Sequence, residues 1–543
     1  MDLTNSYLSY TRGVSAEKIQ PETKRPRMES SVHPLLMDHV IEAVFDYAAT
    51  GNKFCETVRQ FRVVCSLWCK IATKKFRDVY GQMYFENDFD RSTARFIEVM
   101  QNSDDIPFKS FKFTGGFVLY KPYRGDFSYD RVFEKLLSVC SSAVQELEFS
   151  THNPSDLKFP KLLRGIRFDN LRVLSFKMCV FYDRLQCDMP SLLETFFKVS
   201  PQLEKLELTV TTPDGETTEE QLELIETFGD LIVSKLPKTC RHLKLNMPFT
   251  NTQLERFGMQ NVFLESLNVD FRNSPVSTSS LVTFLESQQH TLRDLQLIEC
   301  PVRIVRDTLH FPSLVRLRIE GRAILPYFPF KKVFPVLETF EVVFYWIYQE
   351  DRWLSNVFGE NTYSNTVKQL KICCWVTDSD SQIFQRISKN FPRLNKLQLN
   401  VDSFAVLKEI FKIMKGIEEL EMSLGLEFWR KSGNEVDSVF TGLPEEYISN
   451  KSANFFSCTD MPTTLHEPSL SNMQKLKSLK IVAFQADEVK LTDVTVYYGF
   501  LKMKSLKHLT LDVFPVSENA IQSMKKSFNL MILPDRRHRA FCG

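Results

Sequence analysis

The stretch Thr291–Cys300 reads TLRDLQLIEC and places leucines at Leu292, Leu295 and Leu297, with a cysteine at Cys300. The residues from Leu295 to Leu297 alternate apolar, polar, apolar, which predicts a short strand with one buried face. One such strand cannot cover its own apolar face. The LxxLxLxxC spacing therefore predicts further copies along the chain that stack on this one.

Apolar residues do recur at the first, fourth and sixth positions of this spacing. The clearest copies begin at Leu171, Leu203, Leu264, Leu314, Leu394, Ile417, Leu476 and Leu506. Looser copies begin at Phe108, Val144, Cys240, Leu337 and Val367. An array of this kind between residues 108 and 511 is typical of a leucine-rich-repeat solenoid.

Amphipathic helices separate the expected strands, as in Val406, Leu407, Ile410 and Phe411. Ser191 and Glu194 have capping-box spacing, which predicts a helix that starts just after Ser191. We therefore expect an α/β fold: a small N-terminal helical module, then an irregular leucine-rich-repeat solenoid with a parallel sheet on its concave face and helices on its convex face.

The interval from Ile417 to Leu476 is too long for one repeat and is rich in loop-forming residues. We predict an insertion at about 425–473, which could contain one degenerate repeat. Excision of about Ser432–Pro468 is then expected to leave the solenoid folded.

The chain before the repeats divides by composition. Residues 1–31 are polar and lack hydrophobic periodicity, so we expect a disordered tail. Within it Lys24–Arg27, KRPR, is either a short nuclear import signal or an ordinary solvated basic cluster. We expect a helical module at 32–80, a linker at 81–105 and the solenoid at 106–543.

The helical module carries the most specific motif in the sequence. Arg62–Trp68 reads RVVCSLW and is followed by Ala72, which resembles the RxVCxxW...A signature of the F-box. LMDHVIEAVFDYA, from Leu36, resembles the first F-box helix, with Met37 at the usual proline position and His39 at the usual acidic one. Together with the repeats that follow, this domain order resembles the F-box/leucine-rich-repeat family.

The resemblance implies a non-catalytic subunit of an SCF-type E3 ubiquitin ligase. Its F-box would dock onto the Skp-type adaptor of the cullin complex, and the repeats would hold a protein substrate. The residues expected to bind the adaptor are Leu36, Val40, Ile41, Val44, Phe45, Val64, Cys65 and Trp68. The alternative is that the module only caps the repeats of a protein-interaction scaffold with no role in ubiquitin transfer.

The strand pattern also indicates where a target would bind. The fifth position of each repeat lies between buried positions and must face the concave side. This column is polar and of mixed sign, which favours a protein partner, although solvent-facing strand positions are polar in any sheet. The residues expected to bind substrate are Lys244, Arg318, Glu341 and Lys371, together with Trp346 from the aromatic run at residues 344–348.

Composition argues against several other functions. The 68 basic and 67 acidic residues give a net charge of +1, so no basic field is available to attract nucleic acid or an anionic membrane. No nucleotide-binding glycine motif or zinc-binding spacing occurs, so we expect no cofactor and no metal. The 12 scattered cysteines and the lack of a signal peptide or long apolar run favour a cytoplasmic or nuclear location.

Overall fold

The computed structural model describes most of the chain from residue 40 onward. The described residues are 40–44, 60–61, 64, 66–80, 82–86, 97–98, 100–101, 108–114, 129–151, 163, 165–179, 189–211, 219–260, 262–272, 274, 276–300, 309–321, 329–344, 353–359, 362–425, 427–451, 467–483, 491–512 and 516–532. They form two compact units, one made of residues 1–231 and 235–239 and the other of residues 232–234 and 240–543.

The first unit combines N-terminal helices with the first repeats. Its helices are α3 (Ser66–Tyr80), α5 (Tyr129–Cys140), α7 (Met189–Val199) and most of α8 (Glu219–Lys235). Its strands are β1 (Gln82–Glu86), β2 (Ser110–Thr114), β3 (Glu146–Thr151), β4 (Val173–Cys179) and β5 (Lys205–Thr211). They pair in parallel and in sequence order.

The second unit continues the same pattern with eleven strands in sequence order. Its strands are β6 (His242–Asn246), β7 (Ser266–Asp270), β8 (Asp294–Ile298), β9 (Arg316–Glu320), β10 (Thr339–Val343), β11 (Gln369–Val376), β12 (Lys396–Val401), β13 (Glu419–Leu424), β14 (Ser478–Ala483), β15 (His508–Leu511) and β16 (Asn529–Ile532). Each neighbouring pair is parallel.

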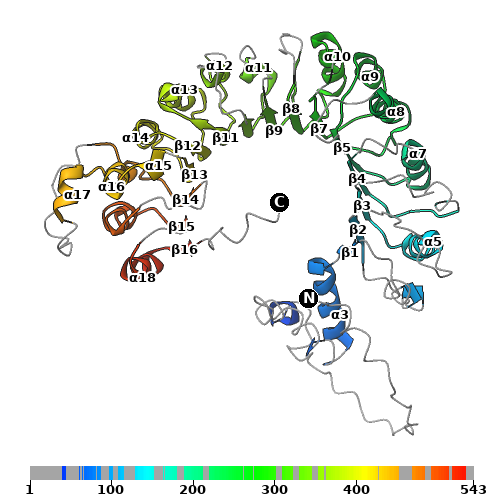
Figure 1. Ribbon diagram of the computed structural model, residues 1–543, viewed down its shortest axis with the longest axis horizontal. Helices are drawn as coiled ribbons and strands as arrows, with labels where there is room; N and C mark the ends of the chain where they lie inside the picture. Colours follow the sequence, from blue (N-terminus) through cyan, green and yellow to red (C-terminus); the bar gives the residue numbers. More distant parts are fainter. Residues whose placement is uncertain are drawn as a thin grey trace, which may run out of the picture. The chain divides into compact units, whose positions relative to one another are not determined.

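Helices and helical turns connect these strands. They are α9 (Asn251–Gly258), α10 (Thr278–Gln288), α11 (Phe330–Val333), α12 (Trp353–Val357), η6 (Asp378–Asp380), α13 (Ile383–Asn390), α14 (Phe404–Ile413), α15 (Glu427–Arg430), α16 (Gly433–Thr441), α17 (Glu445–Lys451), η7 (Leu470–Asn472), the π-helical turn η8 (Thr495–Gly499), η9 (Phe500–Lys502) and α18 (Glu518–Ser527). Within this unit the strands line the inner side and the helices the outer side (Figure 1). The expected α/β solenoid with a parallel sheet is confirmed.

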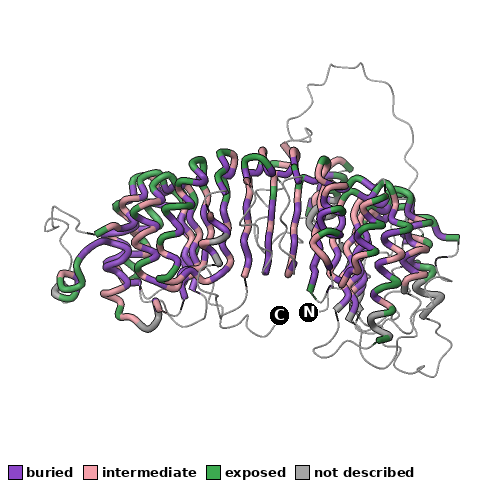
Figure 2. The backbone as a smooth tube through the Cα atoms, turned by 90° about the horizontal axis from the view of Figure 1, so that it is seen from above, coloured by how far each residue is buried: buried purple, intermediate pink, exposed green. Residues whose placement is uncertain are grey.

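The fourth and sixth positions of the repeats form the core, as the spacing predicts. Leu243, Leu245, Leu267 and Val269 are all nearly inaccessible. Figure 2 shows buried segments along the strands and most exposed residues on the helices and turns. Because each strand is covered only by its neighbours and its own helix, the core is continuous along each unit.

Aromatic rings replace leucine in part of the first unit. Phe149 on β3 stacks on Phe113 of β2 and on Phe176 of β4, with centroid separations of 5.2 and 5.1 Å. All three rings occupy the sixth position of their repeats. All three rings are buried, and full burial of one such ring contributes roughly 1.5–3 kcal/mol.

Two expectations about boundaries are wrong. β1 lies within the stretch 81–105 that was expected to be a linker, and its residues pair in parallel with β2. The five-residue strand lacks the upstream leucine of the repeat spacing, so the sheet begins one strand earlier than the motif indicates. The capping box at Ser191 is also wrong, because α7 already begins at Met189.

The proposed insertion at about 425–473 is partly a core element. α16 has its own capping box, in which the Ser432 hydroxyl and Glu435 exchange hydrogen bonds with the backbone, and Val436, Val439 and Phe440 are buried. β13 pairs directly with β14. Excision of Ser432–Pro468 would therefore remove part of the core and would not be tolerated. Residues 452–466 lie outside the described residues.

Candidate functional site

Two surfaces contain the residues that the sequence singles out, and the first is the N-terminal helical module. Its small core consists of Ile41, Phe61, Ile71 and Ala72. Leu67 and Trp68 pack against this core and remain half-buried, and the rings of Phe61 and Trp68 are 4.5 Å apart. Four of these six side chains belong to α3. The packing of α3 against Ile41 and Phe61 therefore fixes the position of Trp68.

Not all the expected adaptor-binding residues can contact a partner. Ile41 is completely buried, so it belongs to the module's core and not to its surface. Val44 and Val64 are 37% and 57% exposed, and Val40 is half-buried. Leu36, Phe45 and Cys65 lie outside the described residues. Sequence reasoning left out Leu67, which the neighbouring Trp68 could have indicated.

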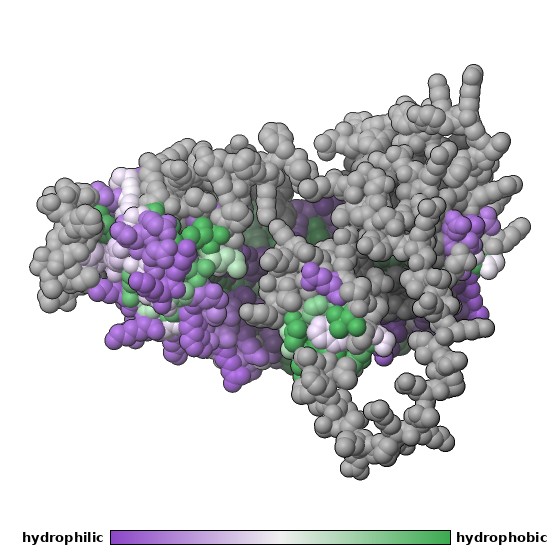
Figure 3. Space-filling model, turned by 90° about the horizontal axis from the view of Figure 1, so that it is seen from below, coloured by the Kyte–Doolittle hydropathy of each residue, from purple (hydrophilic) through white to green (hydrophobic). Residues whose placement is uncertain are grey.

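Hydrophobic side chains gather on the surface of this module, in the lower centre of Figure 3. An ion pair between Lys74 Nζ and Glu42 Oε1, 2.8 Å apart, links α3 to residues 40–44. Both partners are largely exposed, so the pair contributes little stability. Among its described residues, the module thus has a small buried core and, outside it, apolar side chains that face solvent.

The second surface is the inner face of the sheet. The strand registers align the fifth positions of neighbouring repeats as direct partners, as the sequence predicts. In the second unit this column runs through Lys244, Asn268, Gln296, Arg318, Glu341, Lys371, Gln398, Glu421, Lys480 and Thr510. Cross-strand neighbours in such a column lie about 5 Å apart, so long side chains reach one another.

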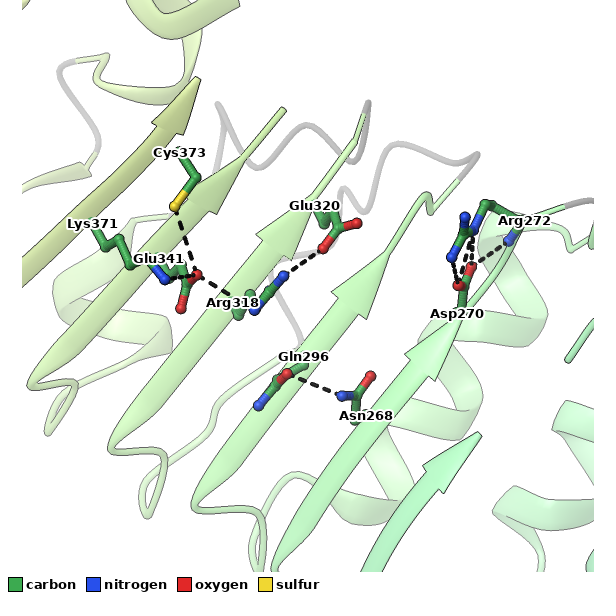
Figure 4. A network of polar contacts seen from close by, with 9 residues as sticks. All are labelled: Asn268, Asp270, Arg272, Gln296, Arg318, Glu320, Glu341, Lys371 and Cys373. Atoms are coloured by element: carbon green, nitrogen blue, oxygen red, sulfur yellow. Dashed lines mark hydrogen bonds and ion pairs between the residues drawn. The ribbon is translucent and has the colours of Figure 1, made fainter. Parts of the chain in front are cut away.

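Three of the five expected substrate-binding residues form one network (Figure 4). Glu341 Oε1 lies 2.9 Å from Lys371 Nζ and 3.4 Å from Arg318 Nη1. Arg318 Nη2 also lies 2.8 Å from Glu320 Oε2. Lys244 is on β6, three strands away from β9, and does not join this network. Trp346 lies outside the described residues.

The network affects the protonation of its members. Burial lowers the pKa of Lys371, but its hydrogen bond to Glu341 and the negative charge nearby outweigh this, so the pKa is raised. Burial raises the pKa of the Cys373 thiol, whose Sγ lies 3.9 Å from Glu341 Oε1. At neutral pH the lysine is therefore charged and the thiol is neutral, which makes Cys373 a poor nucleophile.

These charges face the inner side of the sheet, but they are not freely exposed, and reversing one of them is costly. The side chains of Arg318 and Glu341 are only 29% and 18% exposed. Their charges neutralise each other across strands, so the reversal of one leaves like charges in contact. On β9 to β11 the inner face therefore carries charges that are paired with one another.

A further pair at the seventh position was missed by sequence reasoning. The carboxylate of Asp270 is almost fully buried and accepts hydrogen bonds from the backbone N–H of Arg272, at 2.9 Å, and from its guanidinium, at 2.6 Å. Figure 4 shows both residues at the end of β7. Asp270 thereby fixes the turn that leaves the strand. The sequence signal for this pair was an acidic residue at the seventh position of the repeat, followed two residues later by an arginine.

Among the described residues no group of histidine, cysteine and acidic side chains could hold a metal ion. Burial raises the pKa of Cys140 to about 12 and that of Cys374 even further. In the part of the chain that the structure describes, no helix is long and apolar enough to cross a bilayer.

Comparisons with known proteins give similarity to solved structures alone. The sequence matches no protein-family model and no curated protein. Among solved structures, a chain in the crystal structure of the Rad7 and Elc1 complex in yeast is 14% identical over 95% of this chain and 100% of that chain, with a TM-score of 0.31. A protein from Bacteroides fragilis is 13% identical over 61% of this chain and 66% of the other, with a TM-score of 0.22.

Proposed function

We propose that this chain is a non-catalytic substrate-recognition subunit of an F-box-type ubiquitin ligase. Residues 40–80 would bind a Skp-type adaptor and the inner face of the repeats would bind a protein target. The observation that carries the proposal is the apolar surface of the helical module. Val44 and Val64 are exposed and Leu67 and Trp68 half-buried, whereas Ile41, Phe61, Ile71 and Ala72 form a buried core.

A cap that served only the repeats would have no need of this surface. Exposed apolar side chains on a small module, together with the RVVCSLW motif, indicate a docking site. The inner face supports the second half of the proposal, since its paired and nearly neutral charges suit a protein more than nucleic acid.

The test is co-purification of the full chain with a Skp-type adaptor and cullin. The double variant Val44→Glu/Val64→Glu places charges on the apolar surface without entering the core, so we expect adaptor recovery to fall at least about tenfold. Lys70→Glu, at an exposed position on α3 of the same module, is the matched control and should bind normally. Circular dichroism must show that all variants remain folded.

The outcome also decides between the two functions considered from the sequence. If the intact parent protein recovers no adaptor, the proposal fails and the chain is better described as a leucine-rich-repeat scaffold. If the double variant binds as well as the parent, an adaptor binds somewhere other than Val44 and Val64.

A further inference from the structure

The last strand of the sheet, β16, has an open edge. It pairs in parallel with β15 on one side, and no strand of the described chain pairs with it on the other. The Asn529 N–H donates to the Lys507 carbonyl at 2.8 Å. Because the backbone groups of successive strand residues point to opposite sides, the N–H and C=O groups of Leu530 and Ile532 face away from β15. These groups can pair with a further strand.

Core positions of the repeat are exposed on this strand. The register with β15 places Leu530 and Ile532 at the fourth and sixth positions. Their partners on β15, Leu509 and Leu511, are buried. Leu530, in contrast, is half-buried and Ile532 is 41% exposed. Core residues of earlier repeats are covered by the repeat that follows, and the described chain has no strand after β16 to cover these two.

The inner column also changes character on β16. Met531 pairs with Thr510 and so occupies the fifth position, which is polar on every strand from β6 to β15. Its side chain is 59% exposed. Native edge strands are commonly protected by charged residues, but β16 reads NLMI and carries no charge. An uncharged edge with apolar side chains on both faces indicates a strand that another strand covers.

The neighbouring helix carries charges of both signs at opposite ends. α18 packs against η8 and η9 and is the last helix that the structure describes. Glu518 is exposed at its start, and Lys525 and Lys526 are exposed in its last turn. Glu518 accepts a hydrogen bond from the neutral amide of Gln522, and the two lysines form no ion pair among the described residues.

This division of charge indicates what covers the edge. A two-fold axis beside β16 would place two copies of α18 antiparallel, so that Glu518 of each copy faces the end with Lys525 and Lys526 of the other. The antiparallel helix dipoles favour the same arrangement. The C-terminal sequence of the chain itself reads RRHR at residues 536–539 and would only add positive charge beside the two lysines. A second copy is therefore the better complement.

We infer that β16 is a self-association edge, which pairs antiparallel with β16 of a second copy about a two-fold axis at Met531. The open backbone groups of Leu530 would pair with those of Ile532 of the second copy, and those of Ile532 with Leu530. In this register Leu530 lies opposite Ile532 of the second copy, and the two Met531 side chains meet. One symmetric contact thus covers the exposed apolar side chains and satisfies the open edge.

Sedimentation velocity of the full chain across the micromolar range tests the inference. The contact is small, so we expect a monomer–dimer equilibrium with a micromolar dissociation constant. Met531→Lys brings two ammonium groups together at the axis and should weaken dimerisation at least about tenfold, and Met531→Glu should do the same with two carboxylates. Met259→Lys, at a methionine that is 80% exposed outside β16, is the matched control and should dimerise as the parent does.

A mixture of the two variants tests the register. A chain with Met531→Lys meets a chain with Met531→Glu as opposite charges only if position 531 faces itself across the axis. The mixture should therefore recover the dimer that each variant has lost alone, measured by energy transfer between differently labelled chains. Both substitutions replace an exposed side chain, so circular dichroism melts should match the parent.

A parent chain that stays monomeric throughout this range would overturn the inference, as would dimers that both Met531 variants keep. Growth beyond a dimer would overturn the two-fold pairing, and a mixture that stays monomeric would overturn the register at Met531. If the parent is monomeric and Met531→Lys instead loses a different protein, β16 pairs with that protein and self-association is wrong. The inference does not rest on the proposed function, because the proposed adaptor surface lies in the first unit, so either can fail alone.

Discussion

At the residue scale, Asp437 shows how a single buried charge can organise a repeat. Its side chain is completely buried, and its oxygens accept hydrogen bonds from the Thr492 backbone N–H, at 3.0 Å, and from the hydroxyls of Thr492 and Thr495, at 2.5 and 2.6 Å. It thereby caps the helical turn that starts after Thr492. Asp437→Ala should lower the free energy of unfolding by about 3 kcal/mol, because one buried and two partly buried donors would lose their acceptor.

Urea unfolding would measure this loss, with Asp493→Ala, a more exposed cap of the next helix, as the comparison. A loss for Asp437→Ala no larger than for Asp493→Ala would contradict the structural role given to the buried carboxylate.

The pH dependence of stability provides a second test at Asp437. Burial raises its pKa above the ordinary 3.8, although the three donors act in the opposite direction. The folded state therefore binds the proton more tightly than the unfolded state. Between the ordinary and the raised pKa, the free energy of unfolding should fall as the pH rises. Relative to Asp437→Asn, the parent should lose stability over this interval and level off above it; a rise with pH would contradict the raised pKa.

The paired charges of the inner face lead to a prediction about Glu341. Glu341→Lys would place three cationic side chains together, with Arg318 and Lys371 on either side. We expect a loss of about 1–3 kcal/mol, and partial recovery on addition of Lys371→Glu, which restores an opposite pair. Thermal melts of the single and double variants measure both effects. A double variant less stable than Glu341→Lys would argue against direct pairing.

At the element scale, α16 decides whether the long interval between β13 and β14 is core or insertion. The ring of Phe440 lies 5.9 Å from Phe411 of α14 and 6.5 Å from Phe500 of η9, measured between centroids. Phe440→Ala should destabilise the second unit by about 3–5 kcal/mol, because the cavity lies between three elements. Glu446→Ala, exposed on α17, is the control. If Phe440→Ala and Glu446→Ala had equal denaturation midpoints, α16 would be part of an insertion and not of the core.

At the scale of the whole molecule, the proposed function assigns adaptor and target to different surfaces. Val44→Glu/Val64→Glu should lose the adaptor and keep protein targets, whereas the charge swap Glu341→Lys/Lys371→Glu should do the reverse. Quantitative mass spectrometry of both pull-downs measures the separation. Coordinated loss of all partners in the charge-swap variant, with its fold intact, would show that the two surfaces do not act independently.

The sequence by itself determined the repeat, the positions of strands β2 to β15 and the residues of the inner column. These depend on local periodicity: a side chain at position five of LxxLxL faces away from the core wherever the repeat stacks, so Arg318, Glu341 and Lys371 could be placed without coordinates. The same local reasoning placed Val64 and Trp68 on one small helical module.

Only the tertiary structure decided which of these residues are paired, buried or exposed. Ile41 and Val44 belong to the same apolar pattern in the sequence. Ile41 is buried because it packs in one cluster with Phe61 and Ile71, whereas Val44 lies outside that cluster and is exposed. The polar sequence around Asp437 resembles a loop, but the threonines 55 and 58 residues further along the chain make it a buried cap. Contacts between residues so far apart are not encoded in any local period, and for that reason the packing of α16 and the Glu341 network emerged only once the repeats were stacked.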